Sequence, residues 1–230
     1  MNFTLKPKNI LILFSTLTLI FLTLFYSSYI FDIQDNYLFD EYFNITREKN
    51  VPTFFSFSIM IFVAIVYYLM YKKTTKWKWF IISLFFIYLG FDDMFKIHEH
   101  LGSDLGEIVA EDALKTGFQS YYWQVVFVPL FAIFGLFIAY VTSREFWKEK
   151  NIKGIYILLG GFSLYAIAII LDFYEGTNSD FTWISNIFYT LSKNGIVELM
   201  RATEEAIEML GGTLILVSLL KLKEVHISLN

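Results

Sequence analysis

The feature that most constrains the fold is a series of long, nearly uncharged apolar segments. Each runs for roughly 18 to 25 residues, enough for a helix rising 1.5 Å per residue to cross the ~30 Å hydrocarbon core of a bilayer. A helix also satisfies its backbone hydrogen-bonding groups internally, as that environment requires. The apolar runs cover about residues 9–31, 52–71, 79–97, 121–143, 154–173 and 197–220. The sequence therefore predicts an all-α, polytopic transmembrane bundle of about six helices, formed by residues 1–230 as a single unit.

The composition supports this class and excludes several others. The chain is 56% hydrophobic and 20% aromatic but only 17% charged, whereas soluble domains carry about a quarter charged residues. It contains no cysteine, which excludes disulfides, Cys-ligated zinc and iron–sulfur clusters. No segment is basic enough to indicate binding of nucleic acid.

The distribution of charge predicts the orientation of the bundle. The two termini and the turns at 72–78 and 144–153 contain 12 of the 18 Lys and Arg residues. By the positive-inside rule these segments lie in the cytoplasm, which requires an even number of crossings. Of the 22 acidic residues only Glu145, Glu149 and Glu224 then lie inside. We expect a multi-pass protein of the plasma (cytoplasmic) membrane with both termini in the cytoplasm.

This topology leaves three longer connections on the outer side, at residues 32–51, 101–120 and 176–196. Connections of that length are often functional or fold locally. In the last one, residues 181–191 place apolar side chains at helical spacing, which favours a helix lying on the membrane surface.

Three of the predicted helices carry ionisable residues near their outer ends. At 1.5 Å per residue these groups lie at similar depths, in the outer third of the bilayer. We therefore expect helices 79–97, 154–173 and 197–220 to be neighbours with their outer ends in contact. The residues are Asp92, Asp93, Lys96, His98, Glu99 and His100 on the first, Asp172 and Glu175 on the second, and Glu198, Arg201, Glu204, Glu205 and Glu208 on the third.

Burying so many carboxylates requires neutralisation, because each costs at least ~2.5–3.5 kcal/mol in hydrocarbon. Only Lys96 and Arg201 are local cations, so protonation or a bound divalent ion must supply the rest. Histidine and carboxylate together are ligands of zinc, iron or manganese in helix bundles. The Glu-x-x-His motif of di-metal bundles is absent, and His-Glu-His and Glu-x-x-Glu occur instead. The predicted metal ligands are Asp93, His98, His100, Asp172, Glu205 and Glu208, with Glu99 and Glu204 as candidate general bases.

Structural interpretations of the same residues stay open. Arg201 has Glu198 and Glu205 at i−3 and i+4, the spacing of a salt-bridge ladder, and Asp92 has Lys96 at i+4. If the helix leaves the membrane early, the histidines are simply hydrated. The glycine pairs at 160–161 and 211–212 indicate close contacts between helices.

Three functions fit these observations. The first is a metal-dependent membrane enzyme, a hydrolase or oxidoreductase, acting on a lipid or small apolar substrate. The second is a non-catalytic accessory subunit that binds membrane lipid or a partner protein in the membrane through its acidic outer face. The third is a cation or proton transporter, and the lack of ionisable residues in the inner halves of the helices counts against it.

Overall fold

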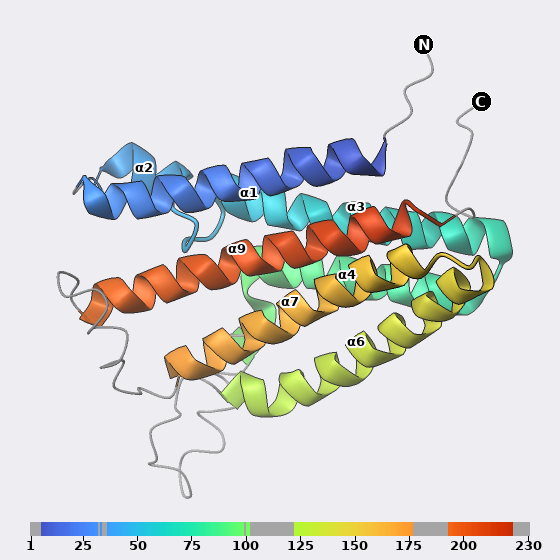
Figure 1. Cartoon of the computed structure of the whole chain (residues 1–230). Helices are drawn as coiled ribbons and strands as arrows, with labels where there is room; N and C mark the ends of the chain where they lie inside the picture. The colour runs from blue at the N-terminus through green and yellow to red at the C-terminus, as the bar shows by residue number, and fades with distance from the viewer. Residues whose placement is uncertain are drawn as a thin grey trace, which may run out of the picture.

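The computed structural model describes residues 6–31, 33, 36–98, 100–101, 122–176 and 193–222. Throughout these residues the regular secondary structure is helical, which confirms the predicted all-α bundle (Figure 1). The helices are α1 (Pro7–Ile30), α2 (Tyr37–Tyr42), α3 (Val51–Thr74), α4 (Trp77–Phe95), α6 (Tyr122–Lys148), α7 (Ile152–Gly176) and α9 (Lys193–Leu219).

Local sequence signals explain the antiparallel pair formed by α3 and α4. The side chain of Asn50 caps α3 by accepting a hydrogen bond from the backbone N–H of Thr53 at 3.1 Å. Pro52 occupies the first turn, where its missing N–H is not needed. The helix ends at Thr75, whose φ of 55° is left-handed, and α4 begins two residues later. This tight turn is one of the two basic turns predicted to be cytoplasmic.

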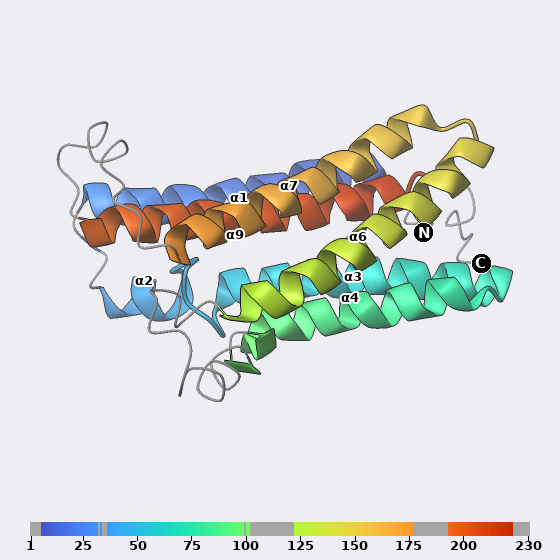
Figure 2. The same cartoon turned by 90° about the horizontal axis from the view of Figure 1, so that it is seen from below.

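The long helices form two layers with an oblique helix between them. Figure 2 shows α1, α9 and α7 in one layer, α3 and α4 in the other, and α6 crossing at an angle. Within the layers α7 packs along α9, α1 packs on the other side of α9, and α3 packs along α4. Contacts of α3 with α9 and of α6 with α7 join the layers.

Glycines set the spacing between α7 and α9. A Cβ atom added at Gly161 would lie 2.8 Å from the backbone oxygen of Gly211, and one at Gly211 would lie 3.1 Å from the oxygen of Gly161. A Cβ at Gly212 would meet Met60 of α3 at 2.6 Å. Both predicted glycine pairs therefore include residues that allow close packing between helices.

Charged side chains connect α4 to α6 at the end away from α2. Glu145 is buried, and its carboxylate accepts hydrogen bonds from Lys78 at 3.0 Å and Lys148 at 2.8 Å. Beside this network the ring of Tyr67 stacks on Trp79, and its hydroxyl lies 3.0 Å from the hydroxyl of Thr142. One lysine of each predicted inner turn thus contacts the same buried carboxylate.

Four helices are long and apolar enough to cross a membrane: α1, α3, α6 from Phe127 and α7 to Asp172. The other two long helices, α4 and α9, carry ionisable residues within their apolar lengths. Six crossings and the orientation of the termini stay predictions. The helix bounds extend past the apolar runs in places, since α6 continues to Lys148 and α9 starts at Lys193.

The predicted outer connections are only partly described. Residues 32–51 contain the short helix α2, which the sequence analysis did not anticipate, capped by the side chain of Asn36. The predicted surface helix at 181–191 lies outside the described residues.

Candidate functional site

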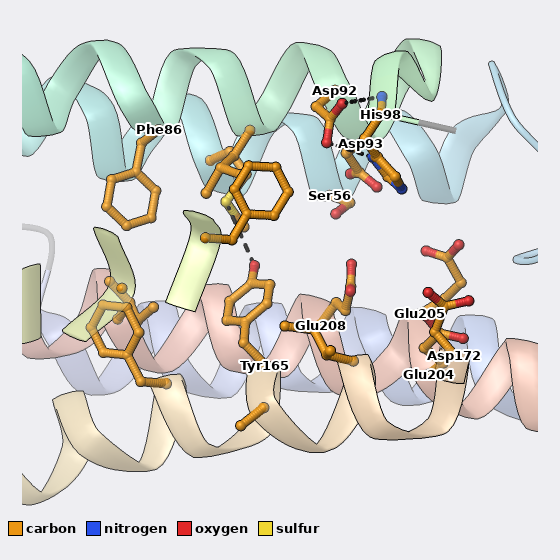
Figure 3. Close-up of a pocket in the computed structure, with 18 of the residues that line it drawn as sticks. Ser56, Phe86, Asp92, Asp93, His98, Tyr165, Asp172, Glu204, Glu205 and Glu208 are labelled. Carbon is orange, nitrogen blue, oxygen red and sulfur yellow. Dashed lines mark hydrogen bonds and ion pairs between the residues drawn. The ribbon is translucent and has the colours of Figure 1, made fainter. Parts of the chain in front are cut away.

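A cavity of about 580 Å³ lies between the two layers. Its lining is divided: apolar side chains of α4, α6 and α7 line one part, and ionisable side chains gather at the other (Figure 3). We call the ionisable part the acidic end. Its ionisable lining residues are Arg47, Glu48, Asp92, Asp93, Lys96, His98, Asp172, Glu204, Glu205 and Glu208.

Three carboxyl groups at the acidic end converge. Asp93 of α4, Glu205 and Glu208 each place a carboxyl oxygen so that all three lie within 4.8 Å of one another. Glu205 and Glu208 are three residues apart on α9 and therefore share a face of that helix. Figure 3 shows them reaching from the α7–α9 side of the cavity toward Asp93 on the opposite side. We call these three residues the carboxylate triad.

Asp93 is only partly satisfied by its surroundings. The hydroxyl of Ser56 on α3 donates a hydrogen bond to its carboxyl group. The Oδ2 atom is buried and has no hydrogen-bond partner among the described residues. Since buried polar atoms nearly always have a partner, an unpaired oxygen on a carboxyl group that closely approaches two others calls for a proton or a cation.

Electrostatics lead to the same requirement. Two unit charges ~4 Å apart repel by about 4 kcal/mol at an effective dielectric constant near 20. Fully ionised, the triad would contain three such repulsions, and Asp172 and Glu204 line the same cavity. The ionised triad is therefore unstable without a counter-charge among its oxygens.

His98 is oriented by a buried carboxylate. Lys96 adopts a left-handed conformation with φ of 46° and ends α4. The chain then turns back, so that Asp92 receives the backbone N–H of His98 at 2.8 Å and lies 2.6 Å from its Nδ1. The hydroxyl of Tyr88 donates weakly to the same carboxylate at 3.4 Å. A carboxylate that fixes an imidazole in this way is typical of metal sites and of proton-transfer sites.

The structure brings most of the predicted site residues together. Asp172 and Glu204 line the cavity with the triad, and half-buried His98 lines it beside Asp93. His100 is exposed, is not part of the cavity lining, and places its Nδ1 2.8 Å from the carbonyl oxygen of Lys96. Glu99 lies outside the described residues.

The predicted neighbour relationship is confirmed for one of its three helix pairs, α7 with α9, while α4 meets α9 only through side chains. Helices α7 and α9 pack side by side, and the carboxyl groups of Asp93 and Glu205 approach within 4.8 Å. The α4 helix packs along α3 and reaches α9 through side chains across the cavity (Figure 3).

The structural interpretations are partly confirmed. Arg201 pairs with Glu198 at 3.5 Å, as the salt-bridge ladder predicts, but neither residue lines the cavity. Lys96 pairs with Glu48 at 3.6 Å, whereas Asp92 engages His98. Both Asp92 and Lys96 therefore have partners at longer range in the sequence than the predicted i,i+4 pair.

Sequence reasoning missed Ser56 and Tyr165. Each is a polar side chain inside an apolar helix, and each lines the cavity. The hydroxyl of Tyr165 donates to the sulfur of Met60 at 3.6 Å and so joins α7 to α3. The available signal was a lone polar residue in an otherwise apolar run, which is also common at ordinary helix contacts.

Together, the apolar helices and the interhelical acidic cavity define a helical membrane protein with a carboxylate cluster between its helices. The chain belongs to the family described as Domain of unknown function (DUF8692), whose model matches residues 11–222. No curated protein and no solved structure matches it.

Proposed function

We propose that the protein is a divalent-metal-dependent membrane enzyme acting on a lipid or small apolar substrate. The observation that carries the proposal is the carboxylate triad, whose oxygens lie within 4.8 Å of one another. Ligand oxygens stand ~2.0–2.6 Å from an ion, so oxygens around one ion have this spacing. The triad thus has the dimensions of a single-ion site.

The chemistry of the ligand atoms narrows the choice of metal ion. The triad offers oxygen atoms only, and carboxylate oxygen suits manganese better than zinc within the zinc, iron and manganese class. We assign Asp93, Glu205 and Glu208 as the inner ligands. Asp172 and His98 line the same end of the cavity and are placed to complete or orient the ligand set.

Hydrolysis is the reaction we favour, because it needs no co-substrate besides water. A bound divalent ion would activate a water molecule as the nucleophile. Glu204 is our candidate general base, since it lines the acidic end without belonging to the triad. The apolar part of the cavity would receive the hydrocarbon portion of the substrate.

We further propose the plasma membrane as the location, with both termini in the cytoplasm and the acidic end toward the outer face. The basic turn between α3 and α4 supports this orientation, as does the one between α6 and α7. Both stand at the end of the bundle opposite to the C-terminal end of α4, which carries Asp93 (Figure 1).

Elemental analysis and melting curves test the proposal. We expect protein purified in mild detergent without chelator to contain a stoichiometric divalent metal, and chelator to lower its melting temperature. Asp93→Asn and Glu205→Gln should lose both the metal and the response to chelator. Glu198→Gln is the matched control, on the same helix as Glu205 but outside the cavity lining, and should keep both.

A triad that is neutralised by protons instead of a metal ion would give a clearly different set of results. If protons alone neutralise the triad, no metal co-purifies and chelator has no effect. Asp93→Asn then raises the melting temperature, because a neutral amide does not have to take up a proton when the protein folds. That outcome overturns the enzyme proposal and favours an accessory subunit that binds lipid or a membrane partner protein.

A further inference from the structure

We infer that the substrate is an amphiphile with a single hydrocarbon chain and an uncharged or cationic head group. This inference deepens the proposed function and rests on it for the reaction at the head group. It is carried by the shape, access and charge of the cavity, which are argued in turn below.

The apolar part of the cavity is kept open by small residues on α6. Ala132, Gly135 and Ala139 all line it, at the spacing that places them on one face of the helix. A Cβ atom added at Gly135 would have only the ring of Phe162 within 4 Å, at 3.9 Å. A larger side chain at Gly135 would therefore occupy cavity space beside Phe162 without meeting the backbone of a neighbouring helix.

The opposite side of this space is aromatic and aliphatic, with Phe85, Phe86 and Leu89 of α4 contributing to it. The whole cavity measures about 580 Å³, within the ~300–1,000 Å³ range of pockets that take one drug-sized molecule. We infer that it accommodates one hydrocarbon chain and a head group, and that a two-chain lipid would leave one chain outside.

The cavity reaches the surface of the bundle through α6. Leu136 lines the cavity and is nevertheless 72% exposed. On either side of it along α6, Ile133 and Tyr140 are also exposed apolar residues, and such a surface in a membrane protein faces lipid. A hydrocarbon chain could therefore enter directly from the bilayer, without passing through water.

The charges at the acidic end select the head group. Seven carboxyl groups and the two cations Arg47 and Lys96 line the cavity, a formal charge of −5 when all are ionised. One bound divalent ion would reduce this formal charge to −3. Electrostatic complementarity therefore disfavours an anionic head such as a fatty acid carboxylate and favours a neutral ester or amide, with or without an additional amino group.

Photo-crosslinking tests this inference independently of catalysis. The probes are a monoacylglycerol, an alkyl amine and a fatty acid of equal chain length, each with a diazirine near the chain end. We expect the first two to label cavity-lining peptides of α6 and α7, and the fatty acid to label about tenfold less. Gly135→Phe should reduce labelling by about tenfold or more, because the ring would fill the space of the chain.

The matched control is Leu130→Phe, which places the same side chain on α6 at a residue that is 50% exposed and does not line the cavity. Labelling of this variant should equal that of the unaltered protein. Metal content and melting temperature report folding, and Ala132→Leu provides a smaller obstruction if Gly135→Phe does not fold. If a folded cavity variant and the control are labelled equally, the cavity is not the binding site of the hydrocarbon chain. If the fatty acid labels as strongly as the other two probes, the assignment of the head group is wrong. If the purified protein contains no metal but Gly135→Phe still reduces labelling, the cavity binds the hydrocarbon chain and only the proposal of a metal-dependent enzyme is wrong.

Discussion

Asp92 and His98 are joined by two contacts across the end of α4: the carboxylate of Asp92 receives the backbone N–H of His98 at 2.8 Å and lies 2.6 Å from its Nδ1. Six residues separate them, too far for one helical turn, so this pairing exists only because the chain reverses at Lys96. The carboxylate thus holds the chain that follows the end of α4 and orients the imidazole at the cavity.

Replacing Asp92 should destabilise the protein, and the loss of stability should be larger when both side-chain oxygen atoms are removed than when one is kept. Asp92→Ala removes the carboxylate that accepts the backbone N–H of His98 and should lower the free energy of unfolding by about 1–3 kcal/mol. Asp92→Asn keeps an acceptor for the backbone N–H and should cost less. Thermal melting in mild detergent measures both, with Glu48→Gln as a more exposed control expected to change stability by less than about 1 kcal/mol. Equal melting temperatures for all three variants would contradict this role.

The close packing of α7 on α9 predicts a sharp difference between adjacent glycines. Gly161→Ala would place a Cβ atom 2.8 Å from the oxygen of Gly211 and should lower stability by about 1–3 kcal/mol. At Gly160 the nearest atom to a new Cβ is 3.7 Å away, in Leu214. Gly160→Ala should therefore be neutral or stabilising by up to about 1 kcal/mol through helix propensity. Chemical or thermal unfolding in detergent compares the pair, and equal effects would argue against the observed helix spacing.

The buried network around Glu145 predicts unequal roles for its two lysines. Glu145→Gln removes the charge that Lys78 and Lys148 share and should destabilise by about 1–3 kcal/mol. The side chain of Lys148 is 58% exposed, against 30% for Lys78, so Lys148→Met should cost under about 1 kcal/mol. Lys78→Met should cost more than Lys148→Met. The reverse order in melting temperature would be inconsistent with the network as described.

Orientation is tested by cysteine labelling, for which the cysteine-free chain is well suited. We expect Thr75→Cys, in the α3–α4 turn, to be protected from a membrane-impermeant maleimide added outside intact cells. Glu41→Cys, in the predicted outer connection, should react. Labelling of Thr75→Cys from outside would reverse the predicted topology, and the proposed outward placement of the acidic end with it.

The sequence was sufficient for the helical class and for much of the acidic end. Apolar runs long enough to cross a bilayer have few alternatives to a helix bundle, and charged residues within them have to meet each other. Matching depths therefore anticipated the approach of Asp93 to Glu205, on helices far apart in the chain.

The local geometry of the site could not be predicted. Lys96 carries no Gly or Asn signal for a left-handed residue, so nothing in the sequence indicated that α4 would end there and direct His98 back to Asp92. Whether His98 faced the cavity and His100 faced outward depended on that single backbone conformation. The contribution of Ser56 depended on the rotation of α3, which an apolar helix with little amphipathic character leaves undetermined.

The triad is divided between segments that the ribosome produces at very different times. Asp93 belongs to α4, whereas Glu205 and Glu208 belong to α9, the last helix of the described chain. Membrane insertion proceeds from the N-terminus, so the two glutamates arrive only after the helices from α1 to α7 have been synthesised. A product that stops before α9 would lack two of the three carboxyl groups, and capture of an ion at this site would therefore require synthesis through α9.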